Sequence, residues 1–142
     1  MRLTKFLILF ACSVADVDAA LIYWRIQQGA KCGASIYRQE TLENAIKPHC
    51  RINSDGKSEI ILTDDMKRSY IIPEPPTPLY YLPLPSTDGN GEIVSEDPTD
   101  YHVVVDSNCD FNVVTKVVNV ADDGVTVDNE TRQDCVPDKP ST

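Results

Sequence analysis

The cysteines constrain the fold of this 142-residue chain more than any other feature. Cys12 lies within an N-terminal leader, so a mature chain would keep Cys32, Cys50, Cys109 and Cys135. An even number of cysteines in a secreted chain predicts two disulfide bonds, which can be joined in three ways. A zinc site is the alternative. It is disfavoured because no CxxC pair occurs and the two histidines lie far apart in the sequence.

Residues 1–19 have the pattern of a secretory signal peptide, with a basic start, an apolar run over residues 6–14 and small residues before the expected cleavage point. We expect cleavage between Ala19 and Ala20, and cleavage after Ala15 is the alternative. The apolar run is too short to span a bilayer, which disfavours a retained membrane anchor. The sequence therefore predicts a secreted, extracellular protein.

The mature chain, residues 20–142, has a length that suits one domain. Its formal charge of −9 is distributed unevenly. Residues 20–85 hold 8 basic and 7 acidic side chains, whereas residues 86–142 hold 3 basic and 13 acidic ones. An acidic surface repels phosphate backbones, which disfavours tight nonspecific binding to RNA or DNA. Solubility after secretion is the other explanation of this charge.

Residues 38–50, RQETLENAIKPHC, form the best candidate for a helix. Thr41 is expected to cap it, and Leu42, Ala45 and Ile46 fall on one face. Strands are expected over Ser58–Leu62, Tyr70–Ile72, Leu79–Leu84, His102–Asp106, Phe111–Val120 and Val125–Asp128. The Asp-Gly pair before residue 125 predicts a hairpin turn. One helix followed by antiparallel strands predicts an α+β fold.

The strand-like stretch CDFNVVTKVV, residues 109–118, places a lysine among valines. Side chains alternate between the two faces of a strand, so Cys109, Phe111 and Val113 are expected on one face and Lys116 on the other. Lys116 is then either a solvated charge on a half-exposed sheet or a contact for a phosphate group.

Several segments, taken in order, resemble the fungal guanyl-specific extracellular ribonucleases. KCGASIYRQETLENAIKPHC resembles their start, which has a Cys-Gly pair, a short strand with a tyrosine and then a helix. YLPL resembles their Glu-Phe-Pro strand, EDPTDYHVVVD their Pro-Gly-x-Asp-Arg-Val strand, and CDFNVVTK their Cys…Val-Thr-His strand. A last cysteine completes the pattern, which spans about residues 31–135. The closer likeness is to the RNase-like secreted effectors of plant-pathogenic fungi.

This resemblance implies a microbial ribonuclease-like fold, with one helix packed on a curved antiparallel sheet. It also implies that Cys32 pairs with Cys135 and Cys50 with Cys109. The second pair agrees with the pattern of the residues, because Cys50 lies on the apolar side of the predicted helix and Cys109 shares a strand face with Phe111.

The family cleaves RNA with a glutamate base and a histidine acid, and forms a 2′,3′-cyclic phosphate. The glutamate falls on Tyr81, a poor base at neutral pH, and the histidine falls on Lys116, a weaker acid than imidazolium. The family's arginine falls on His102, or on Tyr101 if the gap is placed differently. The resemblance therefore implies a degenerate site with no intact catalytic residue. His49 is interpreted as a helix-terminal residue rather than a catalyst.

We expect a secreted, RNase-like effector that is not a ribonuclease and that acts by binding a host protein or RNA, outside or inside host cells. Weak RNA binding would centre on His102 and Lys116. One alternative is an active or altered endoribonuclease that uses the same two residues, and another is an unrelated secreted structural or inhibitory domain. No cofactor, metal, DNA or membrane partner is expected, and the chain is expected to be a monomer. Asn129 begins a glycosylation sequon, Asn-Glu-Thr.

Overall fold

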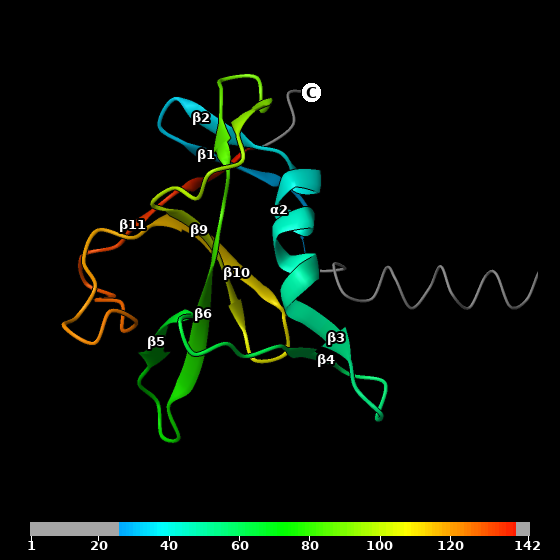
Figure 1. Cartoon of the computed structure of the whole chain (residues 1–142), viewed down its shortest axis with the longest axis vertical. Coiled ribbons are helices and arrows are strands. Elements are labelled where there is room, and N and C mark those ends of the chain that lie inside the picture. The colour runs from blue at the N-terminus through cyan, green and yellow to red at the C-terminus, as the bar shows by residue number, and fades with distance from the viewer. Residues whose placement is uncertain (1–25, 139–142) are drawn as a thin grey trace, which may run out of the picture.

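A computed structural model describes residues 26–138, which form four antiparallel sheets and one α-helix that lies to one side of them (Figure 1). The predicted signal peptide and its cleavage point between Ala19 and Ala20 lie outside the described residues. Within residues 26–138, no helix has the length and apolar character that crossing a membrane requires.

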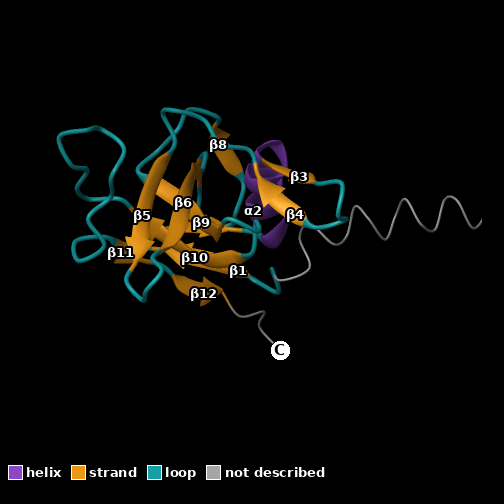
Figure 2. Cartoon of the chain, turned by 90° about the horizontal axis from the view of Figure 1, so that it is seen from below, coloured by secondary structure: helices purple, strands orange, loops and turns teal. Residues whose placement is uncertain are grey.

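The largest sheet has five strands and curls along its length (Figure 2). Its strands, in spatial order, are β11 (Gln133–Asp134), β10 (Phe111–Lys116), β9 (Tyr101–Asp106), β6 (Thr77–Pro83) and β5 (Lys67–Ile71). Each strand is antiparallel to its neighbours. The long central strands β6 and β9 carry most of the buried valine, leucine and tyrosine residues, which explains their place in the middle of the sheet.

The remaining strands form smaller units around this sheet. A three-stranded sheet has the order β12 (Val136–Asp138), β1 (Gly29–Cys32) and β2 (Ser35–Tyr37). Two hairpins are formed by β3 (Cys50–Ile52) with β4 (Ser58–Ile60) and by β7 (Ser86–Thr87) with β8 (Ile93–Ser95). The pairing of β1 with β12 places the first and last described strands side by side.

The helix α2 (Gln39–Ile46) packs its apolar side on β6 and β9. Leu42 and Ile46 are buried there, as their spacing predicts. The predicted cap at Thr41 is wrong, because Arg38 has an extended backbone and occupies the cap position without a side-chain hydrogen bond. The chain turns helical two residues before Thr41, and Thr41 is itself buried in the helix. A short 3₁₀ turn, η1 (Lys47–His49), follows and contains Pro48 in its first turn, where proline is tolerated.

Apolar side chains pack on both faces of the five-stranded sheet. The larger cluster lies on the face that carries α2 and includes Tyr37, Leu42, Leu82, Val103 and Val105. The smaller cluster lies on the opposite face and consists of Leu79, Tyr81, Val104, Val117 and Val127, with Val113 against it. Because both faces are covered, the central strands are apolar on both sides, and simple alternation of apolar and polar residues is lost.

Two disulfide bonds join these units. Cys32 is bonded to Cys135, which ties β1 to the residue between β11 and β12, and Cys50 is bonded to Cys109, which ties β3 to the turn before β10. The pairing that the resemblance implies is confirmed.

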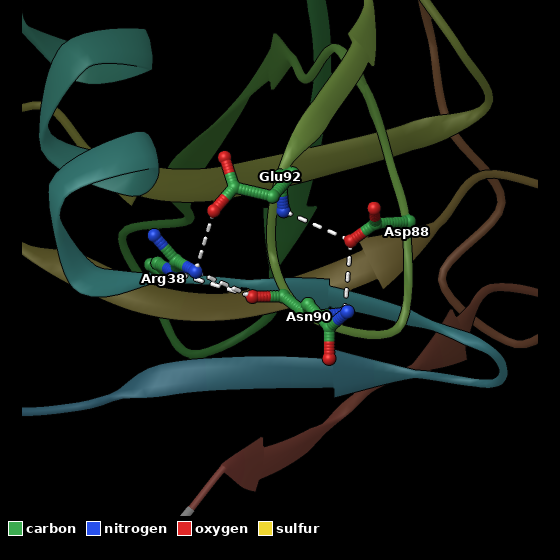
Figure 3. Close-up of polar contacts among 4 residues, drawn as sticks. All are labelled: Arg38, Asp88, Asn90 and Glu92. Carbon is green, nitrogen blue, oxygen red and sulfur yellow. Dashed lines mark hydrogen bonds and ion pairs between the residues drawn. The ribbon is translucent and has the colours of Figure 1, made fainter.

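A clamp fastens the β7–β8 hairpin to the beginning of α2 (Figure 3). The guanidinium group of Arg38 donates hydrogen bonds to the carbonyl oxygen of Asn90 at 2.7 and 3.2 Å and forms an ion pair with Glu92 at 2.9 Å. Within the loop, the Asp88 carboxylate accepts hydrogen bonds from the backbone N–H groups of Asn90 and Glu92. These bonds hold the pKa of Asp88 below its usual value. The clamp thus joins a polar loop that contains Gly89 and Gly91 to the residue that precedes α2.

The predicted strands agree with the structure at the centre of the sheet and differ at its borders. No strand forms over Val125–Asp128, where only single bridges join Thr126 to Arg68 and Val127 to Val120. The predicted strand Phe111–Val120 ends at Lys116. The turn before Val125 does form, with Gly124 at a φ of +77°. After Lys116, the N–H of Val117 still donates to the carbonyl oxygen of Asp100, and the later backbone groups bond to Arg68 on β5 and within the segment itself.

Candidate functional site

A cavity of about 370 Å³ lies where β5, β6 and β9 approach the η1 turn, and we call it the histidine pocket. Both histidines of the chain line it, although they are 53 positions apart in the sequence. The polar lining residues are His49, Thr63, Asp65, Lys67, Tyr81, Thr99 and His102, and the apolar ones are Met66, Leu82, Pro83 and Pro98. The pocket thus combines two imidazoles, one amine, one phenol and one carboxylate.

The register of the strands brings Tyr81 and His102 together. Tyr81 pairs with Val104 and Pro83 pairs with His102, so the two rings lie diagonally on the face opposite α2. Their centroids are 6.2 Å apart and their planes are nearly perpendicular. Lys67 pairs with Tyr81 from β5 and joins the same face. The resemblance identified Tyr81 and His102, and the structure places both in one pocket.

His102 is 5% exposed, and its Nδ1 atom lies 2.9 Å from the carbonyl oxygen of Asp100. A carbonyl oxygen only accepts, so in the neutral ring Nδ1 carries the hydrogen and Nε2 has a free lone pair. Burial lowers the pKa of His102, the Asp100 hydrogen bond opposes this shift, and the charge of Lys67 reinforces it. The neutral imidazole of His102 is therefore favoured relative to that of a free histidine.

His49 approaches the pocket from the end of the η1 turn and is half-buried. Burial lowers the pKa of His49, and the nearby carboxylate of Asp65 partly offsets this effect. The interpretation of His49 as a helix-terminal residue is correct for its position, but it missed that this residue lines the same pocket as His102. Nothing in the spacing of the two residues could have indicated their proximity.

The hydroxyl group of Tyr81 is fully engaged in hydrogen bonds. It donates to Oδ1 of Asn129 at 3.1 Å, so its oxygen accepts from Oγ of Ser69 at 2.8 Å and from Nη1 of Arg132 at 3.0 Å. Arg132 also forms an ion pair with Asp134 at 3.1 Å. A hydroxyl has one hydrogen and two lone pairs, so Tyr81 has no free position with which to accept a proton.

Lys116 does not join this site, and the expectation that it shares a cleft with His102 is wrong. Lys116 pairs with Tyr101 on β9, whereas His102 pairs with Thr115. Directly opposed residues share a sheet face and consecutive residues alternate, so His102 and Lys116 point to opposite faces.

A β-bulge between Phe111 and Val113 causes the error. Phe111 pairs with Val105 and packs in the cluster beside α2, whereas Val113 pairs with Val104 and packs on the far face. The extra residue, Asn112, shifts every later side chain of β10 by one face. Phe111 and Val113 therefore do not share a face, and Lys116 lies on the α2 side with Phe111. On the opposite face, Thr115 is fully buried, and its Oγ1 has no hydrogen-bond partner among residues 26–138.

The sequon residue Asn129 has an exposed side chain whose amide group is in use at both ends. Its Oδ1 accepts from Tyr81, and its Nδ2 donates to the carbonyl oxygen of Tyr70 on the edge strand β5 at 3.2 Å. Asn129 therefore ties the segment after β10 to the sheet. One of its two amide hydrogens stays available, so the contact to Tyr70 and a glycan are chemically compatible.

Lys67, Ser69 and Arg132 are members of the site that the pattern of the sequence did not reveal. The predicted strand begins at Tyr70, so Lys67 and Ser69 fall outside it, whereas β5 includes both. Arg132 lies in a segment with no periodicity at all. Among the described residues, no group of three or more histidine, cysteine, aspartate or glutamate side chains could hold a metal ion. Comparison with protein-family models, curated proteins and solved structures gives no match to this chain.

Proposed function

We propose that this protein is a secreted effector on a ribonuclease-like scaffold, which binds a host protein or RNA and does not cleave RNA at ordinary enzyme rates. The observation that carries this proposal is the hydrogen bonding of Tyr81. At the position where the resemblance expects a glutamate base, the chain has a phenol that is saturated by Ser69, Asn129 and Arg132. The disulfide pairing and the helix on a curled antiparallel sheet support the ribonuclease-like part of the proposal.

RNA binding, where it occurs, would centre on the histidine pocket. Lys67 supplies one positive charge at pH 7, and His49 and His102 add theirs only when the solution is acid enough to protonate them. The net charge of −9 opposes a polyanion at any distance. Binding is therefore weak, and stronger at pH 5 than at pH 7.5. Its dependence on salt is shallow, with a slope of log K against log salt concentration of about −0.7 per phosphate contact.

A cleavage assay tests the catalytic part of the proposal. The mature protein is incubated with a guanosine-containing single-stranded oligoribonucleotide, beside an active guanyl-specific ribonuclease as positive control. We expect no 2′,3′-cyclic phosphate above background, because loss of a positioned acid or base removes about 10²–10⁴-fold of rate. Robust product formation that disappears in His102→Gln would show that the site is catalytic.

An anisotropy titration with the same oligoribonucleotide tests the binding part. We expect Lys67→Gln to weaken binding at pH 5, whereas Lys57→Gln, a lysine in the β3–β4 turn that lines no described pocket, should not. If the protein binds no RNA at either pH, the partner is a host protein, and capture from host tissue becomes the experiment that identifies it. RNA binding that survives Lys67→Gln unchanged places the RNA site elsewhere.

The two histidines also favour a second candidate function, an altered endoribonuclease. Nε2 of His102 has a free lone pair, as a general base requires, and the His49 imidazole in the same pocket could donate a proton. Lys67 would stabilise the charge that develops on the phosphate. This function requires a bell-shaped pH–rate profile and near-complete loss of activity in both His49→Gln and His102→Gln. Activity in Lys116→Gln should be unchanged, because that side chain faces the other way.

A further inference from the structure

The lysine that the β-bulge turns away from the histidine pocket lines a groove on the other face of the sheet. Lys116 and its cross-strand partner Tyr101 line two hollows, of about 460 and 390 Å³. Because both residues belong to both hollows, the hollows adjoin along this pair, and we call them together the Tyr101–Lys116 groove. Its walls come from the β1–β2 hairpin, from β11 and β12, and from the loop before β9.

The groove contains two amines without a fixed counterion. Lys116 is half-buried at its centre and Lys31 lies on the β1 wall. Neither forms an ion pair with another residue in the described part of the chain, although Arg38, Arg51 and Arg132 each do. An amine held partly away from water gains most from a charge-assisted hydrogen bond to an oxyanion.

The acidic residues of the groove leave room for such an anion. Asp134 lines the larger hollow, but Arg132 already neutralises it at 3.1 Å. Asp100 lines only the smaller hollow. The larger hollow thus holds two lysines and one neutralised carboxylate, which is a local excess of positive charge on an acidic protein.

The other lining groups suit a flat, apolar moiety. The half-buried ring of Tyr101 forms one side, and the Cys32–Cys135 disulfide and Val136 form another. Gln133 adds an amide that can donate or accept a hydrogen bond. Aromatic rings stack on exposed tyrosine faces, and sulfur and valine surfaces offer no competing polar group.

We propose that the Tyr101–Lys116 groove is a second binding site, which takes a ligand with a phosphate or carboxylate group beside a planar ring. The oxyanion lies between Lys31 and Lys116, and the ring lies against Tyr101. This site goes beyond the proposed function, because Tyr101 and Lys116 lie on the sheet face opposite to Tyr81 and His102. The larger hollow, which holds both lysines, shares no residue with the histidine pocket, and the smaller hollow shares only Pro98 and Thr99 with it.

The test is an NMR titration of the ¹⁵N-labelled mature protein at pH 7 with three probes: phenyl phosphate, phenylacetate and inorganic phosphate. We expect the amide chemical shifts of the residues that line the groove to change on titration. Phenyl phosphate or phenylacetate should bind more tightly than inorganic phosphate. The stronger of the two ring-bearing probes identifies the anion. Lys116→Gln should weaken that probe about tenfold or more, as the loss of a charge-assisted contact predicts, and Lys31→Gln should weaken it as well.

Lys57→Gln is the matched control, since it also removes one positive charge but lines neither hollow, and it should leave the affinity unchanged. Both groove lysines reach solvent, so the spectra of the variants should remain those of a folded protein. The proposal is overturned if no probe moves the groove resonances, or if binding is the same in Lys116→Gln and Lys31→Gln as in the wild type. If inorganic phosphate binds as tightly as phenyl phosphate, the ring contributes nothing to the affinity and that part of the proposal is wrong. Shifts confined to residues of the histidine pocket would also overturn it, while leaving the proposed function intact.

Discussion

The hydroxyl of Tyr81 is a junction at which three chain segments meet. It links Ser69 on β5, Asn129 in the segment after β10, and Arg132 just before β11. A tyrosine whose hydroxyl has no hydrogen-bond partner in the protein could be replaced by phenylalanine with little loss of stability. Here the replacement would leave three polar partners without their bond in a partly buried place.

We therefore expect Tyr81→Phe to lower the free energy of unfolding by about 1–3 kcal/mol, because each abandoned partner loses a hydrogen bond that water replaces poorly. Urea denaturation of wild type and variant measures the change. Tyr70→Phe is the control, since Tyr70 is 45% exposed and its hydroxyl bonds to no described residue. Equal free energies of unfolding for wild type and Tyr81→Phe would mean that the hydrogen bonds of this hydroxyl do not contribute to stability.

The two histidines make stability depend on pH in a predictable direction. Burial lowers the pKa of both His49 and His102 in the folded state, so the unfolded chain binds protons first as the pH falls. Stability is thus fully present above the ordinary histidine pKa of about 6.5 and decreases as the pH falls toward the lowered folded values. Thermal unfolding from pH 7.5 to 5 should show a falling Tm. The double variant His49→Gln/His102→Gln should show a flatter profile, and an equally steep one would contradict this assignment.

At the scale of single elements, the β7–β8 loop illustrates how a glycine is fixed by a neighbour. Gly91 has a φ of +82°, and a Cβ atom there would lie 2.8 Å from both Cγ and Nε of Arg38. Gly124 has a similar φ of +77°, but a Cβ there would meet nothing within 4 Å. Replacing either glycine by alanine therefore carries the cost of a positive φ, and only the replacement of Gly91 adds a steric clash.

We expect Gly124→Ala to cost about 1 kcal/mol from the left-handed backbone alone. Gly91→Ala should cost more than this, because Arg38 must also move and give up its bonds to Asn90 and Glu92. Chemical denaturation of the two variants gives the difference directly. A cost at Gly91 no larger than at Gly124 would show that Arg38 relocates freely and that the clamp in Figure 3 contributes nothing to stability.

Strand β10 shows which parts of the fold the sequence could predict. Its composition correctly predicts a strand, and the resemblance correctly implies the partners of Cys50 and Cys109. The face of Lys116 could not be predicted, because a single bulge at Asn112 reverses the alternation and no local pattern marks that residue. The short strands β1, β7 and β12 could not be predicted from the sequence either. Each has two to four residues, too few for any periodicity to emerge.

The histidine pocket was predictable only in part, for a reason that applies to elements in general. Tyr81 and His102 lie on adjacent central strands, which a strand-order argument can place. His49 reaches the same pocket only because the helix ends in a 3₁₀ turn at Pro48, and Lys67 only because β5 begins three residues before its apolar part. Contacts of this kind depend on how elements end, and the ends of elements are the least determined by local sequence.

At the scale of the whole molecule, the two disulfides hold the fold together across long separations. Cys32 and Cys135 are 103 positions apart, and Cys50 and Cys109 are 59 apart. In the chain-entropy picture each stabilises the fold by roughly 4–5 kcal/mol, which is a large share of the total for a domain of this size.

We expect either double variant, Cys32→Ala/Cys135→Ala or Cys50→Ala/Cys109→Ala, to be destabilised by several kcal/mol. The first should cost slightly more, because it opens the longer loop. Circular dichroism and urea titration of the oxidised protein and of the two variants measure this. A loss below about 1 kcal/mol in either variant would show that the hydrophobic clusters alone determine the fold.

The pairing of β1 with β12 sets Gly29 opposite Asp138, so the described chain starts and finishes at neighbouring points of one small sheet. A short linker could therefore join these two strands without distorting either. New termini could be opened in the exposed turn between β3 and β4, where residues 54–57 face the solvent. The first and last described strands are thus neighbours, as circular permutation requires. A circular permutant opened in that turn should keep both the histidine pocket and the Tyr101–Lys116 groove.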